Sequence, residues 1–128
     1  MREILFRGKR THNDKWIEGS LHAEKFTDDE EYLCCEVCQC DVYPETVGQY
    51  IGLCDKNGKK IFEGDILKGA WDTIFQVVYD NCYLGFRAKK DGMHNCIDYY
   101  GLDRIEVIGN VTDNPELLKG QNYGIFKD

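Results

Sequence analysis

The sequence predicts a mainly β protein built on a small barrel. Its 128 residues include 13 glycines, which are spread among short apolar runs. Turn signals such as Asp55-Lys56-Asn57-Gly58 separate these runs, and no long stripe with the 3.6-residue period of a helix is present. Short strands joined by tight turns are typical of a small closed sheet, whereas a parallel sheet would need crossover helices.

Residues 1–20 predict an opening β-hairpin. The runs 3–7 and 16–20 have strand character, and the polar stretch between them turns the chain. Phe6 and Trp16 are large apolar residues of these two runs, so we expect both of them to contribute to the core.

Residues 21–46 form a variable segment that is polar and acidic at first and then rich in cysteine. Residues 21–32 show no clear period, which predicts a loop or a short helical turn. The acidic run at 27–31 is interpreted as a solvated loop, because charge is the ordinary content of exposed connections. Within it, residues 24–46 carry this shift in composition and have the character of an insertion between the hairpin and the barrel.

Four of the seven cysteines fall within residues 34–40. The spacing Cys35-x-x-Cys38 is half of a zinc knuckle, and Cys40 could add a third thiolate, but no second knuckle completes a site. In a strand, moreover, alternation puts Cys35 and Cys38 on opposite faces. We therefore predict a buried or half-buried strand with reduced thiols and no cofactor. A structural zinc-binding domain at this cluster is the alternative.

The barrel is predicted over about residues 47–110, within a region that extends to residue 112. Sharp turns such as Glu63-Gly64-Asp65 separate its strands. The run 73–79 is apolar on both faces for much of its length, which indicates a central strand. The expected strands are 49–53, 60–62, 66–68, 73–79, 83–88, 95–100 and 104–110.

Residues 113–120 predict a short C-terminal helix. Asp113 or Asn114 fits the cap, and Pro115 fits the first helical position, where its missing N–H costs nothing. Gly120 is well placed to end this helix after about one turn.

Three segments together resemble the YopX family of phage and prophage proteins. In chain order they read MREILFRG at 1–8, QYIGLCDKNGKKIFEGDIL at 49–67 and IEVIGNVTDNPELL at 105–118. The resemblance implies one YopX-like domain over residues 1–128, an SH3-type barrel for the glycine-punctuated part, and a phage or prophage origin. It supplies no catalytic residues, because the family is itself one of unknown function.

The signature residues of this resemblance have conformational roles. Glycine permits backbone angles that other residues resist, and Asp and Asn hydrogen-bond their own turns. Glu63 and Asp65 could instead form a paired-carboxylate site, but no nearby His or third carboxylate completes one, so we predict that they brace the turn. The fold-signature residues are Gly52, Asp55, Asn57, Gly58, Glu63, Gly64, Asp65, Gly109, Asn110, Asn114 and Pro115.

The sequence favours a protein that is not an enzyme. Phosphate-binding and dinucleotide-binding loops and a nucleophile elbow are absent, and the three histidines are scattered. His94 and Cys96 could pair as base and nucleophile, but a third orienting group is missing, so a plain edge strand is the better interpretation. The N-terminus is charged from its second residue and no apolar run approaches the length of a membrane span, which predicts a cytoplasmic protein of the host bacterium.

We therefore predict a phage or prophage accessory protein that acts as a protein-binding or assembly module and can form homo-oligomers through exposed strand edges. Trp71 is the best candidate for an exposed contact residue because it lies near a loop, whereas Phe62 and Tyr79 are expected in the core. Aromatic residues that could line a contact surface are Tyr50, Phe62, Trp71, Tyr79, Tyr99 and Tyr100.

The alternative to a protein partner is a nucleic-acid-associated module. In that hypothesis the basic turns at 7–10, 56–60 and 87–90 converge on one face. The net charge of −7 argues against general affinity for nucleic acid, although it leaves room for a local basic patch.

Overall fold

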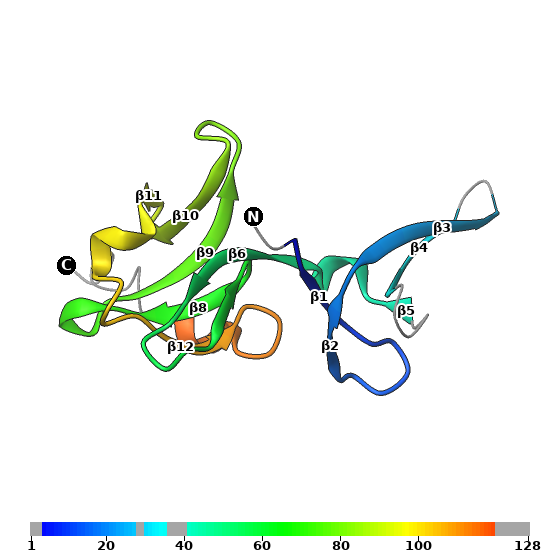
Figure 1. Cartoon of the computed structure of the whole chain (residues 1–128), viewed down its shortest axis with the longest axis horizontal. Coiled ribbons are helices and arrows are strands. Elements are labelled where there is room, and N and C mark those ends of the chain that lie inside the picture. The colour runs from blue at the N-terminus through cyan, green and yellow to red at the C-terminus, as the bar shows by residue number, and fades with distance from the viewer. Residues whose placement is uncertain (1–3, 28–29, 36–40, 120–128) are drawn as a thin grey trace. The chain divides into compact units, whose positions relative to one another are not determined.

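The computed structural model describes residues 4–27, 30–35 and 41–119 of the chain (Figure 1). Within those residues the strands form three sheets, and the helical segments are short 3-10 turns. The predicted mainly β class is therefore confirmed. No helix among the described residues is long and apolar enough to cross a bilayer. The chain divides into two compact units, residues 1–50 and 51–128.

The first unit begins with the predicted hairpin. β1 (Phe6–Lys9) and β2 (Trp16–Gly19) pair antiparallel over their whole lengths, which confirms the prediction for this segment. β1 also pairs with the beginning of β6 (Gly48–Cys54), so it is flanked on both sides. Phe6 and Trp16, the two core candidates, are only half-buried.

A close backbone approach joins this hairpin to the end of the first unit. Val42, in β5 (Asp41–Val42), is buried against Gly8, and a Cβ added to Gly8 would lie 3.0 Å from the Val42 Cβ. In η1 (Pro44–Thr46), the buried Thr46 hydroxyl accepts a hydrogen bond from the amide of Lys9 at 2.9 Å. These contacts explain why β1 has a glycine at its centre.

Residues 21–32 differ from the sequence-based expectation. They lie mostly in two paired strands, β3 (Leu21–Thr27) and β4 (Glu30–Cys35), of a sheet ordered β3-β4-β5. The predicted loop or helical turn is wrong. Of the acidic run at 27–31, Thr27 ends β3 and Glu30 and Glu31 begin β4, whereas residues 28–29 lie outside the described residues. These strands are held together by backbone pairing. A sequence pattern reveals such a strand only when every second residue is apolar, and that alternation is absent here.

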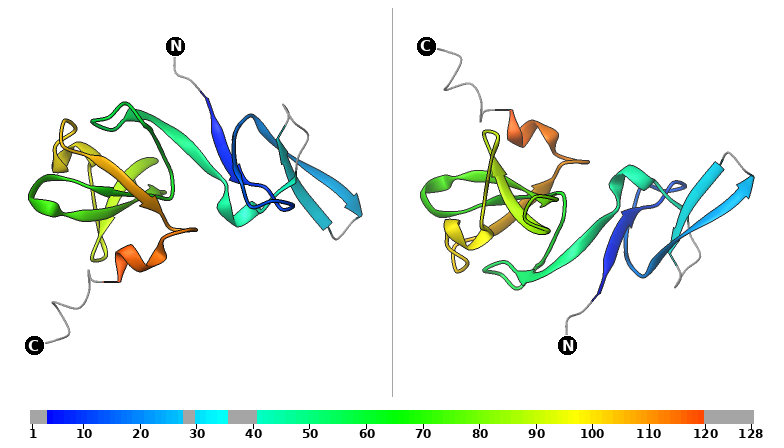
Figure 2. Two further views of the ribbon diagram at one scale, coloured as in Figure 1. Left: turned by 90° about the horizontal axis from the view of Figure 1, so that it is seen from below. Right: turned by 90° about the horizontal axis from the view of Figure 1, so that it is seen from above.

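The second unit is dominated by a five-stranded antiparallel sheet in the order β11-β10-β9-β8-β12. β9 is its central strand, as the apolar run 73–79 predicts. The remainder of β6 neighbours β7 in this unit, and the strands curl into a half-barrel (Figure 2). The strand bounds are β7 (Lys60–Phe62), β8 (Asp65–Lys68), β9 (Ile74–Asp80), β10 (Gly85–Lys90), β11 (Met93–Asn95) and β12 (Glu106–Asn110). The SH3-type assignment stays a prediction.

The core of the second unit lies on one face of the five-stranded sheet. Leu67 lies opposite Phe75, and Val77 lies opposite Ala88, so their side chains share that face. Burying such side chains stabilises the unit by roughly 1.5–3 kcal/mol each. The buried cluster consists of Ile61, Leu67, Phe75, Val77, Ala88, Ile97 and Ile105.

Two elements of this unit depart from the predicted strands. Phe62 is buried as expected, but Tyr79 is 44% exposed because it lies near the end of β9, beyond the buried stretch. The predicted strand 95–100 is wrong beyond Asn95, since the chain continues as the 3-10 helix η3 (Ile97–Tyr100). Ile97, the first residue of this turn, is part of the buried core, a position that the prediction of an edge strand did not include.

The predicted C-terminal helix is not confirmed. Its described part is one 3-10 turn, η4 (Pro115–Leu118), and Gly120 lies outside the described residues. Asn114 does not cap this turn, because its side-chain oxygen accepts a hydrogen bond from the amide of Asn110 instead.

Candidate functional site

Asp55 organises the turn between β6 and β7. Its Oδ1 accepts hydrogen bonds from the amides of Asn57 and Lys59, both at 2.9 Å. Its Oδ2 accepts one from the amide of Val107 in β12, at 3.0 Å. Gly58 completes the turn at φ 83°, a region that favours glycine. A single carboxylate therefore joins the β6–β7 turn to an edge strand that lies 52 residues away in sequence.

The charge of Asp55 is set by these contacts. Burial alone raises the pKa of its carboxyl, but the hydrogen bonds from Val107, Lys59 and Asn57 outweigh burial and hold the pKa below the ordinary 3.8. The buried side chain is consequently ionised at neutral pH, and its charge serves to hold the backbone amides of an otherwise exposed turn.

Asp65 braces the turn between β7 and β8. The residue is buried, and its Oδ2 accepts a hydrogen bond from the amide of Phe62 at 2.8 Å. Gly64 lies inside the turn at φ 93°, and its amide donates to the carbonyl of Val77. Glu63, the other member of the hypothetical carboxylate pair, is half-buried.

The signature residues at the end of β12 and just after it form a second local network. The Asn110 side-chain oxygen accepts hydrogen bonds from the amides of Thr112 and Asp113, at 3.1 and 2.8 Å. A Cβ on Gly109 would lie 2.6 Å from the side-chain oxygen of Asn114, so this position has no room for a larger residue. These contacts give the signature residues structural roles.

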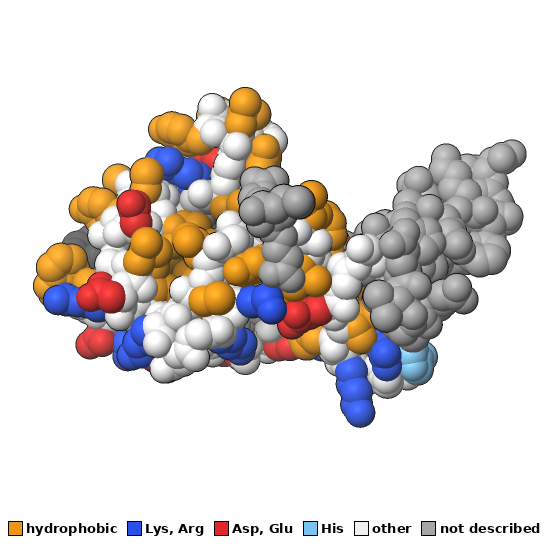
Figure 3. Space-filling view, in the orientation of Figure 1, with side chains coloured by type: hydrophobic (Ala, Val, Ile, Leu, Met, Phe, Trp, Pro, Cys, Tyr) orange, Lys and Arg blue, Asp and Glu red, His pale blue; other side chains and the backbone are white. Residues whose placement is uncertain are grey.

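Large apolar side chains are exposed on the second unit. Trp71, in η2 (Ala70–Asp72), is the extreme case, with an exposure of 85%. Figure 3 shows several hydrophobic side chains on one face of this unit. Those that the structure describes in residues 51–119 are Leu53, Trp71, Tyr79, Tyr83, Leu84, Met93, Tyr99 and Leu102.

Two of these residues have unusual backbone conformations. Trp71 lies at φ 59° and Leu84 at φ 51°, the left-handed region that L-residues with bulky side chains rarely adopt. Asp72, directly after Trp71, has φ 57°. Left-handed backbone costs such residues about 1–2 kcal/mol each. Two strained positions thus present large apolar side chains to solvent.

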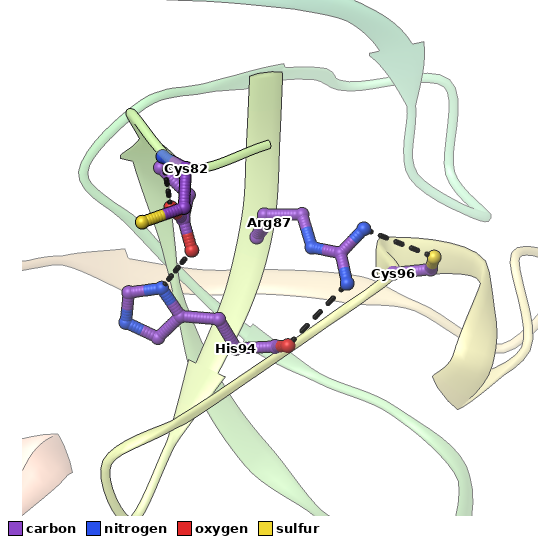
Figure 4. Close-up of polar contacts among 5 residues, drawn as sticks. Cys82, Arg87, His94 and Cys96 are labelled. Carbon is purple, nitrogen blue, oxygen red and sulfur yellow. Dashed lines mark hydrogen bonds and ion pairs between the residues drawn. The ribbon is translucent and has the colours of Figure 1, made fainter. Parts of the chain in front are cut away.

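A polar cluster lies on the sheet next to the exposed β9–β10 turn. The Nδ1 of His94 in β11 is 2.5 Å from Oδ2 of Asp80 in β9, and Oδ1 of Asp80 accepts a hydrogen bond from the amide of Cys82. The bond to His94, opposed by desolvation, lowers the pKa of Asp80 below its ordinary value. This pair ties the central part of the sheet to its short edge strand (Figure 4).

Arg87 in β10 completes the cluster. Its guanidinium lies 4.1 Å from the ring centroid of Tyr83, and it donates hydrogen bonds to the sulfur of Cys96 at 3.3 Å and the carbonyl of His94 at 3.4 Å. In Figure 4 the second ring nitrogen of His94 points away from Arg87 and Cys96. His94 therefore does not act on Cys96 in this arrangement, and the thiol contacts a cation instead of a base.

The cysteine hypothesis falls mostly beyond what the structure describes. Cys34 and Cys35 are the last residues of β4, whereas Cys38 and Cys40 lie outside the described residues. Among the described residues, no group of three or more metal-ligating side chains is present. The zinc alternative at 34–40 therefore stays a prediction.

The basic turns of the second unit are partly neutralised by neighbouring carboxylates. Lys56 lies 3.8 Å from Glu106, and Lys90 lies 3.0 Å from Asp91. Arg87 is engaged with Tyr83 and Cys96, as described above. These pairings reduce the positive charge that the two turns could offer to a phosphate backbone.

Comparison with protein-family models shows to which family the chain belongs. The model of the YopX protein family matches residues 5–119, most of the sequence and both units. The chain belongs to the YopX family. The family model thus spans the hairpin, the 21–46 segment and the turn networks around Asp55 and Asn110.

A solved structure shows a similar fold. The crystal structure of protein EF1440 from Enterococcus faecalis matches with a TM-score of 0.58 and 23% sequence identity. The match covers 92% of this chain and 99% of that chain. At this identity the likeness concerns the fold alone. A search of curated proteins gave no match.

Sequence reasoning missed the cluster around Asp80. Asp80 and His94 are 14 residues apart and come from β9 and β11, which are separated in the sheet by β10. The paired registers of three strands determine their contact, and no single-sequence pattern reports such registers. The positive φ of Trp71 likewise had no sequence signal, since glycine, the usual marker, is absent at that position.

Proposed function

We propose that this YopX-family chain is a non-enzymatic protein-binding or assembly module of a phage or prophage, and that Trp71 lies in its contact surface. The observation that carries the proposal is the 85% exposure of Trp71 in a left-handed conformation. An exposed tryptophan contributes no core packing, and its backbone conformation is costly. Tryptophan is also among the residues that contribute most to protein interfaces.

The polar cluster supports a non-enzymatic role. General base catalysis would need a nucleophile or substrate at the outward nitrogen of His94, and Cys96 is held by Arg87 on the other side (Figure 4). The bonds of Asp80, Arg87 and His94 instead fix β11 and the β9–β10 turn, the frame on which Tyr83 and Leu84 are exposed.

We propose the cytoplasm of the host bacterium as the place of action, and self-association as one form that assembly takes. The odd number of seven cysteines fits a compartment in which thiols stay reduced. β11 and β12 are the two edges of the five-stranded sheet, and strand edges can pair with another chain.

Site-specific photo-crosslinking tests the proposal. A benzophenone amino acid replaces Trp71 in one variant and Glu116, an exposed residue of η4, in the control. In cells that express the phage or prophage genes, we expect one discrete crosslinked protein with the residue-71 variant, identified by mass spectrometry, and none with the control. A second copy of the chain in that product would indicate self-association.

Equal crosslinking from both positions, or uncrosslinked chain alone, would overturn the proposed contact surface. An aromatic crosslinker is chosen because it keeps a large ring at position 71.

A further inference from the structure

Trp16 and Tyr83 each form cation–π contacts with basic side chains of the same chain. The guanidinium of Arg7 lies 4.9 Å from the Trp16 ring centroid, and the ammonium of Lys9 lies 6.0 Å from it. The guanidinium of Arg87 similarly lies over the ring of Tyr83. Trp71 is different: within the described part of the chain no cation lies over its ring. The Trp71 ring, which is 85% exposed, thus has a face on which the described residues place no cation.

The residue after Trp71 supplies a second exposed group, the carboxylate of Asp72. The side chain of Asp72 is 88% exposed and forms an ion pair with Lys68 at 3.4 Å, and the side chain of Lys68 is 44% exposed. An exposed pair of this kind contributes little, since water screens both charges. Asp72 can therefore exchange Lys68 for a cation presented from outside without loss of a strong contact.

The neighbouring surface adds further negative charge. The loop between β8 and β9 and the helix η3 lie side by side in Figures 1 and 2. η3 and the turn after it contribute Asp98 and Asp103, both exposed, together with the exposed ring of Tyr99, against one exposed cation, Arg104. This composition favours a cationic over an anionic partner.

We propose that Trp71 and Asp72 together bind an arginine or lysine side chain of a protein partner. The indole face attracts the cation through its quadrupole, and the carboxylate pairs with the same charge. This inference rests on the proposed function and adds the chemistry of the partner. Both residues have a left-handed backbone, and the ring and the carboxylate are both exposed on one short loop.

Indole N–H resonances of the 15N-labelled chain provide the test. The chain has two tryptophans, so two resonances are expected, and Trp71→Phe assigns them. The probe is a blocked Gly-Arg-Gly-Arg-Gly peptide, and the control is the same peptide with citrulline, which has nearly the same shape without the charge. We expect the Trp71 resonance to move with the arginine peptide, and Trp16, already covered by Arg7 and Lys9, to stay in place.

Asp72→Asn should weaken the binding of the arginine peptide by up to about fivefold, the upper end of the range for an exposed charge pair. Glu116→Gln, an exposed carboxylate on η4, is the matched control and should leave it unchanged. Shifts of equal size with the citrulline peptide, an equal loss in both variants, or no shift of Trp71 at millimolar peptide would overturn the inference.

The two proposals fail separately. A crosslink from position 71 without an arginine-dependent shift removes the cationic partner and leaves the contact surface in place. Absence of the crosslink removes the contact surface itself. A shift of the Trp71 fluorescence emission to shorter wavelength on addition of uncharged phosphatidylcholine vesicles would indicate that the ring binds a lipid surface. That result would contradict both the protein contact surface and the cationic partner.

Discussion

The turn at Asp55 and the turn at Asp80 use the same residue for opposite purposes. Asp55 is nearly buried and accepts three hydrogen bonds from backbone amides of two different elements. Asp80 accepts a hydrogen bond from the amide of Cys82 and pairs with the side chain of His94. Tyr83 and Leu84, in the same turn, are largely exposed. The first turn closes the fold, and the second carries side chains that contribute little to it.

The two kinds of turn also differ in backbone chemistry. Gly58 and Gly64 occupy the left-handed positions of the turns that Asp55 and Asp65 organise, where glycine removes the strain. In the exposed loops the left-handed positions include Trp71 and Leu84. The difference indicates that the exposed loops keep particular side chains at a cost in stability, which is typical of surfaces retained for binding.

The largest effect is expected at Asp55. Asp55→Ala leaves the amides of Asn57, Lys59 and Val107 without their acceptor, so we expect the free energy of unfolding to fall by about 3 kcal/mol. Urea denaturation measures this change. Asp103→Ala, an exposed carboxylate of the same unit, should change stability by less than about 0.5 kcal/mol. Similar midpoints for the two variants would contradict the structural role of Asp55.

The same carboxylate predicts a pH dependence. The pKa of Asp55 is lower in the folded protein than its ordinary 3.8, so the unfolded state binds the proton more readily. The contribution of Asp55 is therefore fully present above the unfolded pKa and is lost as the pH falls through the folded pKa.

Urea titrations from about pH 5 down to about pH 2 would measure this loss. Asp80, whose pKa is also lowered, adds to it in the same direction. In Asp55→Asn the decline should be shallower than in the parent chain, and equal slopes would show that Asp55 does not carry it.

A smaller effect is expected at Gly109. Gly109→Ala places a methyl group 2.6 Å from the side-chain oxygen of Asn114, and we expect a destabilisation of about 2 kcal/mol. In an Asn114→Ala background the oxygen is absent, so the same alanine should cost less. A double-mutant cycle measures this coupling, and additive changes would contradict the proposed clash.

These turns were accessible to sequence reasoning because their bonds are local. Two of the three amides that donate to Asp55 belong to Asn57 and Lys59, two and four residues along the chain. Gly58, the glycine that marks this turn, lies between Asp55 and Lys59. The pair of Asp80 and His94 was not accessible, because it depends on the register of β9, β10 and β11. The strands β3 and β4 were not predicted for a related reason. They are stabilised by pairing with each other, and their sequences lack the alternating pattern that predicts a strand.

The smallest effect is expected at Trp71, and its sign is informative. Trp71→Gly removes a ring that is 85% exposed and relieves the left-handed strain, at the cost of a more flexible unfolded chain. We expect a gain of up to about 1 kcal/mol, or a few degrees in melting temperature. Trp71→Ala removes the same ring but keeps the strain, so its stability should stay close to that of the parent chain. Destabilisation by both variants would mean that the ring supports the fold, and Trp71 would then belong with Asp55 among the structural residues instead of among the exposed contacts.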